Sequence, residues 1–215
     1  MRFKAVVFDL DGTLLDTIDD LADSMNVALA VHGLPKRTPA QCKYFVGDGV
    51  RNFALRAMAP VSDEKVLAKV IEKYTADYAQ RWAAKTRPYE GVVELLRELG
   101  QRGLAMAVLS NKPDEFTRRM TQQMLPDCFA VVVGARPDVP HKPDPAAALA
   151  IARQLGAEPA QCLYVGDTNT DMQTAAAAGM YGVGVLWGFR TKAELIQNGA
   201  KSLVNHPLEL LDLLD

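Results

Sequence analysis

The chain has 215 residues, of which 49% are hydrophobic and 23% charged, and its formal net charge is −2 at pH 7. These values are ordinary for a globular protein, and the nearly neutral balance gives no bulk attraction to nucleic acid or to an anionic membrane. Cys42, Cys128 and Cys162 lie far apart and lack the spacing of metal ligands. No segment reaches the ~18–20 apolar residues of a membrane span, and the first apolar run ends at Asp9. We expect a cytoplasmic protein that binds neither membranes nor nucleic acid.

Short, almost continuously apolar segments recur along the chain and predict buried parallel β-strands. They cover residues 4–8, 104–109, 129–134, 162–166 and, with two glycines inside, 181–186. Helical apolar stripes at 92–99 and 147–155 separate the later segments. Because strands alternate with helices, we expect an α/β fold with a doubly wound parallel sheet, a Rossmann-like core.

Residues 16–87 interrupt this alternation. Apolar residues with a 3.6-residue period run over 18–29, and residues 53–58 and 66–82 also have helical patterns. Pro88 and Gly91 mark the return to the strand-helix pattern. We therefore expect a helical block at 16–87, inserted into an α/β core formed by 1–15 and 88–215.

Polar residues gather where the predicted strands end, which is where open α/β sheets bind ligands. The set consists of Asp9, Asp11 and Thr13 after the first strand, Ser110 and Asn111 after the second, Lys142 before the fourth, and Asp167 and Asp171 after it. If these ends share one edge, four carboxylates meet there. Two carboxylates about 5 Å apart repel by about 3 kcal/mol at an effective dielectric constant of 20, so the cluster requires a cation. Mg²⁺ suits such oxygen ligands together with a phosphate oxygen.

Four motifs in this set follow one another in a recognisable order. They are Asp-x-Asp-Gly-Thr at 9–13, Ser-Asn at 110–111, Lys-Pro-x-Pro at 142–145 and Gly-Asp-x-x-x-Asp at 166–171. Together they resemble the motifs of the haloacid dehalogenase-type phosphohydrolases and span nearly all of the predicted core. The resemblance implies a phosphatase that forms an aspartyl-phosphate on a small phosphorylated metabolite.

The same resemblance implies a role for each residue. Asp9 would be the nucleophile, and Asp11 the general acid and then the general base. Asp11 lies two residues after Asp9, so in an extended chain its side chain would point to the same side. Lys142 would stabilise the charge on Asp9 and on the transferring phosphoryl group. Asp9, the backbone carbonyl of Asp11 and Asp167 would bind Mg²⁺, with Asp171 binding through water or orienting the other ligands.

Three further residues would contact the substrate. Ser110 and Asn111 would hold phosphate oxygens in a loop after the second strand, and a helix starting near Pro113 would direct its N-terminus to the same place. Thr13 would bond to the backbone or to the phosphate region.

The inserted helical block resembles the small cap domain of this family. Residues 47–58 resemble the Gly-x-Gly-x₆-Arg-Ala stretch of phosphoglycolate phosphatases, and residues 187–190, Trp-Gly-Phe-Arg, resemble their Trp-Gly-Tyr segment with Phe in place of Tyr. Gly47 and Gly49 permit a tight turn that opens a helix, and Arg51 could pair with a substrate carboxylate. Alternatively, Arg51 and Arg56 are solvated helix residues and the glycines only cap the helix.

We take 2-phosphoglycolate as the leading substrate. Sugar phosphates, nucleotides and pyrophosphate are alternatives, because related caps serve them, and a sugar phosphomutase would share the same motifs. A phospho-receiver signalling domain also combines acidic residues, a hydroxyl and a lysine, but its acidic pair is normally adjacent. We expect a monomer or a homodimer.

Overall fold

The structure, a computed structural model, describes residues 3–214 of the chain. It divides into two compact units, one formed by Met1–Leu15 and Pro88–Asp215 and the other by Asp16–Arg87. The chain crosses between them at β2 (Leu15–Asp16) and β3 (Arg87–Pro88), which pair as a two-stranded sheet. Within the described part of the chain, no helix combines the length and apolarity needed to cross a membrane.

The first unit contains a six-stranded sheet in the order β5-β4-β1-β6-β7-β8, with every neighbouring pair parallel. Its strands are β1 (Ala5–Phe8), β4 (Ala105–Pro113), β5 (Phe129–Ala135), β6 (Cys162–Gly166), β7 (Tyr181–Val185) and β8 (Ser202–Val204). This arrangement confirms the predicted doubly wound α/β fold. The three-residue strand β8 was not predicted, because so short a segment carries no detectable pattern.

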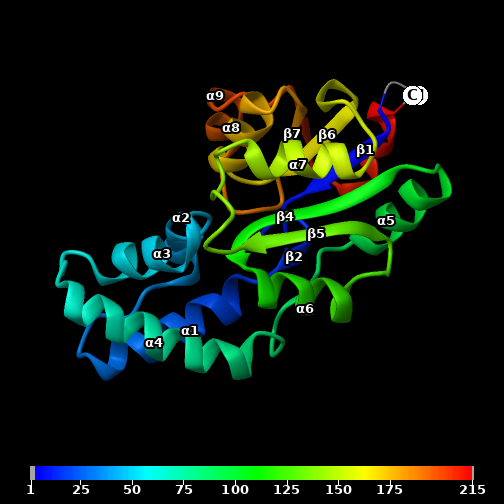
Figure 1. The fold of residues 1–215 in the computed structure, drawn as a ribbon. Coiled ribbons are helices and arrows are strands. Elements are labelled where there is room, and N and C mark those ends of the chain that lie inside the picture. Colours follow the sequence, from blue (N-terminus) through cyan, green and yellow to red (C-terminus); the bar gives the residue numbers. More distant parts are fainter. Residues whose placement is uncertain (1–2, 215) are drawn as a thin grey trace. The chain divides into compact units, whose positions relative to one another are not determined.

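Helices cover both faces of this sheet. Figure 1 shows α5 (Val92–Gln101) and α6 (Asp114–Met124) on one face, and α7 (Ala146–Gln154) and α8 (Asn169–Ala177) on the other. Ala5 and Val7 of the central strand pack with Ala148 and Ile151 of α7 in a buried cluster. The remaining elements are α9 (Lys192–Gln197) and the 3₁₀ helices η1 (Pro159–Gln161) and η2 (Pro207–Leu213). The strands are therefore shielded on both sides, which explains their continuous apolar character.

The strand register brings the ends of β1 and β6 level with the later part of β4, at one edge of the sheet. Phe8, the last residue of β1, pairs with Val108 of β4 and with Val165 of β6. The residues that follow these positions therefore emerge side by side. This is the edge where the sequence places its polar motifs.

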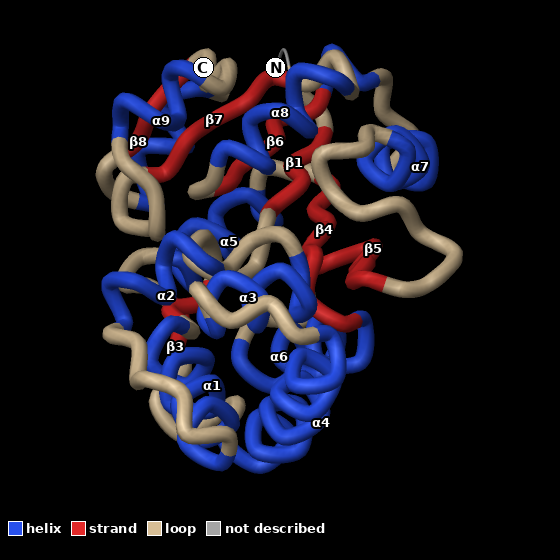
Figure 2. The backbone as a smooth tube through the Cα atoms, turned by 90° about the vertical axis from the view of Figure 1, so that its left-hand side faces the viewer, coloured by secondary structure: helices blue, strands red, loops and turns tan. Residues whose placement is uncertain are grey.

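The second unit consists of helices joined by loops, as Figure 2 shows, and only its two end residues belong to strands. It contains α1 (Ile18–Val31), α2 (Pro39–Phe45), α3 (Gly49–Met58) and α4 (Glu64–Arg81). Helix α2 was not predicted, because Cys42 is its only buried residue and no apolar stripe marks it. Asp20 links the beginning of this unit to its end. Its buried carboxylate accepts hydrogen bonds from the N–H groups of Lys85 and Thr86, at 2.9 and 2.8 Å.

Candidate active site

The acidic end of β6 is shaped by a helix cap. Thr168 is the N-cap of α8: its hydroxyl oxygen accepts from the N–H of Asp171, while its own N–H and hydroxyl donate to Asp171 Oδ2 at 3.0 and 2.6 Å. Such a reciprocal capping box fixes the first turn of a helix. It returns the Asp171 carboxylate to the strand end beside Asp167.

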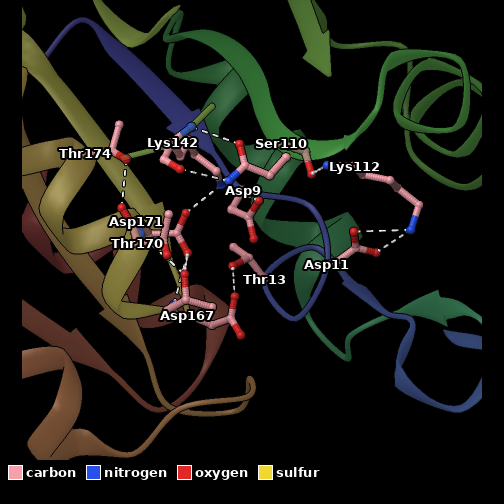
Figure 3. Close-up of polar contacts among 12 residues, drawn as sticks. Asp9, Asp11, Thr13, Ser110, Lys112, Lys142, Asp167, Thr170, Asp171 and Thr174 are labelled. Atoms are coloured by element: carbon pink, nitrogen blue, oxygen red, sulfur yellow. Dashed lines mark hydrogen bonds and ion pairs between the residues drawn. The ribbon is translucent and has the colours of Figure 1, made fainter. Parts of the chain in front are cut away.

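Three buried carboxylates meet at the sheet edge. Asp9, Asp167 and Asp171 each offer an oxygen, and these oxygens lie within 4.8 Å of one another (Figure 3). They come from the ends of β1 and β6 and from the first turn of α8. The arrangement could hold a metal ion, since all of its donors are carboxylate oxygens.

Lys142 provides the cation inside this cluster. Its Nζ donates to Asp9 Oδ1 and to Asp171 Oδ1, both at 2.7 Å, and only 3% of its side chain is exposed. Asn111 holds the lysine backbone, accepting from the Lys142 N–H at 2.9 Å and donating to the Lys142 carbonyl at 3.0 Å. The Asn111 amide therefore helps to place Lys142, and its contact with a phosphate oxygen stays a prediction.

The cluster contains more negative than positive charge. Burial and the nearby Asp171 raise the pKa of Asp9 well above its usual value, although Lys142 opposes them. Burial and Asp171 likewise raise the pKa of Asp167 to about 7, although its hydrogen bonds oppose this. Burial by itself would lower the pKa of Lys142, but Asp171 and Asp9 raise it well above its usual value. Three carboxylates with one ammonium therefore favour binding of a further cation.

Two segments distant in sequence enclose Asp167. Its Oδ1 accepts from the Thr13 hydroxyl at 3.0 Å, and its Oδ2 accepts from the Phe189 N–H at 2.8 Å. The indole N–H of Trp187 donates to the Thr13 carbonyl at 3.0 Å, which joins the two segments. Because Phe189 acts through its backbone, the replacement of tyrosine by phenylalanine leaves this contact intact.

The Trp-Gly-Phe segment approaches Asp167 closely. A side chain at Gly188 would place its Cβ 2.2 Å from Asp167 Cβ and 2.5 Å from the Gly12 carbonyl oxygen. Any residue larger than glycine would therefore force the enclosing segment away from the carboxylate.

Asp11 does not join the carboxylate cluster. Its two carboxylate oxygens accept from Lys112 Nζ at 2.9 and 3.2 Å, and Figure 3 shows this pair pointing away from Asp167 and Asp171. The expectation that Asp9 and Asp11 point to the same side is wrong. Strand β1 ends at Phe8, and the N–H groups of residues 13–15 donate to the Leu10 carbonyl, so the chain turns and the strand alternation does not reach Asp11.

Ser110 and Lys112 lie inside β4, which continues to Pro113, and not in a loop after the strand. The pairing of β4 with β5 shifts register between Leu109 and Pro113, so this end of the strand is irregular. The buried Ser110 Oγ accepts from the Lys112 N–H at 3.2 Å, which leaves its hydroxyl hydrogen able to donate elsewhere. Helix α6 begins directly after Pro113, as predicted.

In the second unit, Gly47 and Gly49 have φ angles of +116° and +85°, and α3 begins at Gly49. The Arg56 side chain of α3 bonds to residues just before this helix. It donates to the Phe45 carbonyl at 3.0 Å and forms an ion pair with Asp48. This result corrects the interpretation of Arg56 as a merely solvated residue, because its guanidinium bonds the turn.

Arg51 lies on the exposed surface of the same unit. Its guanidinium is 2.7 Å from Glu64, and the two side chains are 58% and 71% exposed. A pair so exposed contributes little to stability, typically below about 1 kcal/mol, and is easily exchanged for another partner. The contact is compatible with an Arg51 that binds a substrate carboxylate.

Comparison with known proteins assigns the family. The sequence pattern of the haloacid dehalogenase-like hydrolases matches residues 6–185. An N-acetylmuramic acid 6-phosphate phosphatase of Pseudomonas aeruginosa is 33% identical over 217 residues, covering 100% of this chain and 96% of that protein. Phosphoglycolate phosphatase 1 of the same organism is 31% identical over 222 residues, covering 99% of this chain and 80% of that protein.

A solved structure shows the same fold over the whole length. It is a predicted phosphoglycolate phosphatase from Haemophilus somnus 129PT, 26% identical, with a TM-score of 0.93 and coverage of 100% of this chain and 99% of that chain. The present chain therefore belongs to the haloacid dehalogenase-like hydrolases. Within that family it is a phosphoric monoester hydrolase, which confirms the resemblance inferred from the four motifs.

Two site residues escaped the sequence prediction. Lys112 stands beside Ser110 and Asn111, but nothing local indicates that its ammonium reaches Asp11, 101 residues earlier. The role of Thr168 could have been predicted from the sequence. A threonine with an acidic residue three positions later, here Asp171, is a capping pattern at the start of a helix.

Proposed function

We propose that the protein is a Mg²⁺-dependent phosphomonoester hydrolase that works through an aspartyl-phosphate on Asp9. The observation that carries this proposal is the buried cluster of Asp9, Asp167 and Asp171 around the single ammonium of Lys142. A nucleophilic carboxylate needs a phosphorus atom whose negative oxygens are neutralised, and this cluster is built to gather positive charge.

The residues present fit a magnesium ion. We assign its binding to the carboxylates of Asp9 and Asp167 and to the backbone carbonyl of Asp11, since Mg²⁺ takes oxygen ligands and keeps several waters. Both oxygens of Asp171 already accept hydrogen bonds, from Lys142 and from Thr168. The bonds to Asp167 come instead from two uncharged donors, the Thr13 hydroxyl and the Phe189 N–H. Because Asp171 is paired with an ammonium, we favour the orienting or water-mediated role for Asp171 over direct ligation. When bound, the ion would offset charge on the phosphoryl oxygens.

In the first step, a carboxylate oxygen of Asp9 attacks phosphorus and forms the acyl phosphate bond. The bond from phosphorus to the substrate oxygen breaks, and protonated Asp11 gives its proton to that oxygen, which leaves as an alcohol. Lys142 balances the charge that Asp9 carries before attack. The Ser110 hydroxyl donates to a phosphoryl oxygen.

In the second step, water attacks the phosphorus of the aspartyl-phosphate. Asp11, now a carboxylate, takes a proton from this water, and the bond between phosphorus and Asp9 breaks. Inorganic phosphate leaves, and Asp9 is a carboxylate again while Asp11 is protonated. Each group returns to its starting state, so one cycle consumes one phosphomonoester and one water.

For the substrate we propose 2-phosphoglycolate. The resemblance of residues 47–58 and 187–190 to phosphoglycolate phosphatases supports it, as does the relative of that name. An N-acetylmuramate 6-phosphate substrate is the second candidate, because the relative with that activity matches this chain over its full length at a similar identity.

A comparison of kcat/KM tests the proposal. The panel contains 2-phosphoglycolate, N-acetylmuramate 6-phosphate, glucose 6-phosphate, a nucleoside monophosphate and pyrophosphate, each assayed with and without a chelator. We expect hydrolysis to stop in the chelator and to return with Mg²⁺, and 2-phosphoglycolate to give the highest kcat/KM. Turnover that persists in the chelator contradicts the metal dependence, and a higher value for another compound reassigns the substrate. Activity that appears only with a sugar bisphosphate activator would indicate a mutase.

Arg51→Ala tests recognition of the substrate carboxylate. We expect KM for 2-phosphoglycolate to rise about 10-fold, the effect of losing roughly 1.4 kcal/mol from one charge-assisted hydrogen bond, while KM for 4-nitrophenyl phosphate stays unchanged. Lys69→Ala, at an exposed position of α4, is the matched control and should change neither value. Equal effects on both substrates would remove Arg51 from recognition.

A further inference from the structure

Lys112 is a buried cation to which the proposed reaction gives no role. It lies in β4, only 4% of its side chain is exposed, and its Nζ is 2.9 and 3.2 Å from the two oxygens of Asp11. A buried ammonium is retained only with a carboxylate or comparable acceptors around it. Contact with both oxygens also restricts the rotation of the carboxylate.

The two members of this pair differ in how firmly the chain holds them. The backbone of Lys112 is bonded on both sides: its N–H donates to Ser110 Oγ at 3.2 Å, and its carbonyl accepts from the Thr117 hydroxyl of α6 at 3.1 Å. Asp11 lies in the turn after β1, where its backbone forms an isolated bridge with Leu15, but 18% of its side chain is exposed, against 4% for Lys112. Lys112 is therefore the fixed member, and it determines where the Asp11 carboxylate lies.

Electrostatic forces also determine where the Asp11 carboxylate lies. Figure 3 shows Lys112 and Asp11 on one side of Asp9, and Asp167 and Asp171 on the other. An ionised Asp11 is repelled by that cluster, where Lys142 already serves two carboxylates. The attraction to Lys112 and this repulsion both keep the Asp11 carboxylate away from the cluster.

We infer that Lys112 is a positioning residue for Asp11, which it holds apart from the carboxylates around Lys142 so that the carboxyl group serves proton transfer. The inference rests on the proposed function, in which Asp11 gives a proton to the leaving oxygen. Lys112 does not touch the reacting atoms in this assignment. Its contribution is the direction of the Asp11 side chain.

Leaving-group dependence tests this inference. A 4-nitrophenolate leaves without help from an acid, whereas an alkoxide needs the proton, and general acid catalysis contributes about 10²–10⁴-fold. We expect Lys112→Met to lower kcat about 10- to 100-fold on propyl phosphate but less than about 3-fold on 4-nitrophenyl phosphate. KM and the Mg²⁺ concentration for half-maximal activity should stay unchanged, which a distorted metal site would not allow.

A double-mutant cycle separates an effect through Asp11 from an independent one. If Lys112 acts only through Asp11, then adding Lys112→Met to Asp11→Asn should change kcat on propyl phosphate by less than about 2-fold, because the two changes share one mechanism. Multiplicative losses, equal losses on both substrates, or wild-type rates in Lys112→Met each overturn the inference.

The single variant Asp11→Asn shows whether a negative result contradicts the proposed function or only the inference about Lys112. If Asp11→Asn loses no more activity on propyl phosphate than on 4-nitrophenyl phosphate, the assignment of Asp11 as general acid fails. If Asp11→Asn shows that selectivity and Lys112→Met does not, only the inference about Lys112 fails.

Two further variants control for folding. Lys112→Arg keeps the positive charge and should recover part of the rate on propyl phosphate; if Lys112→Met does not fold, a selective loss in Lys112→Arg supports the inference and a uniform loss overturns it. Arg119→Met removes a surface ion pair with Glu115, 2.6 Å long, and should match the wild-type protein. Circular dichroism and thermal unfolding of each variant check the fold.

Discussion

Two lysine–carboxylate groups lie at the same sheet edge and differ in their charge balance. Lys142 is paired with two fully or nearly fully buried carboxylates, and Asp167 adds a third. Lys112 is paired with the partly exposed Asp11. The first group has an excess of negative charge that favours a cation and raises the pKa values of Asp9 and Asp167, whereas the second joins an ammonium to a carboxylate that is partly exposed to water. Similar residue types therefore give one centre that gathers positive charge and one that fixes a side chain.

The largest expected effect is on kcat and comes from Asp9, in the group around Lys142. Asp9→Asn should lower kcat by about 10⁴-fold or more, because the amide cannot replace a nucleophilic carboxylate. The fold should persist, since the change removes one buried negative charge from a cluster that has too many. Phosphate release and circular dichroism measure the two results. A rate within 10-fold of wild type would end the assignment of Asp9 as nucleophile.

The second-largest effect is on stability: replacing Lys142 should lower the free energy of unfolding more than replacing Lys112. Lys142→Met leaves two buried carboxylates without their cation and should cost about 3–5 kcal/mol of unfolding free energy. Lys112→Met leaves the partly exposed Asp11, which water can solvate, and should cost about 1–2 kcal/mol. Urea denaturation in the presence of a chelator measures both. Equal losses would show that the two groups are not electrostatically different.

A control isolates the charge effect at Lys142. The double variant Lys142→Met/Asp171→Asn should recover part of the lost stability, because one of the two uncompensated carboxylates is then neutral. A double variant less stable than Lys142→Met would mean that packing, and not charge, dominates at this lysine.

The smallest expected effect is the pH dependence of stability, measured with a chelator present so that no metal ion is bound. The pKa of Asp167 rises from about 3.9 in the unfolded chain to about 7 in the folded one, so the folded state holds an extra proton between about pH 4 and 7. Stability from this group is therefore greatest at low pH and is lost as the pH rises through that window. The raised pKa of Asp9 acts in the same direction.

Asp167→Asn removes this contribution. In a chelator, its Tm minus that of the wild-type protein should increase from pH 5 to pH 8, because only the wild type loses stability by ionising this group. The surface variant Asp138→Asn, whose side chain is 75% exposed, should give a constant difference. A Tm difference for Asp167→Asn that does not change with pH would show that Asp167 titrates near its ordinary value.

The sheet was largely predictable because its signals are local. Apolar runs that end in glycine or aspartate marked β1 and β6, and a helical apolar period marked α1, α5 and α7. The end of β4 was not predictable: Ser110 and Asn111 resemble a loop in composition, yet the strand continues through them with a register shift that depends on β5.

The candidate site divides in the same way. The meeting of Asp9, Asp167 and Asp171 follows from parallel strands whose ends share an edge, so topology alone predicted it. The direction of Asp11 did not follow, because it depends on a turn after β1 and on an ammonium from another strand.

The amino-acid sequence by itself determined most strands and helices of the core, the acidic residues that follow β1 and β6, and the family. These follow from periodicity and motif spacing, which are properties of neighbouring residues. Only the tertiary structure decided that Lys112 is paired with Asp11, 101 residues away, and that Lys142 bonds Asp171 as well as Asp9, which is 133 residues away. At such separations the contacts depend on how the strands pack, and no local pattern encodes them.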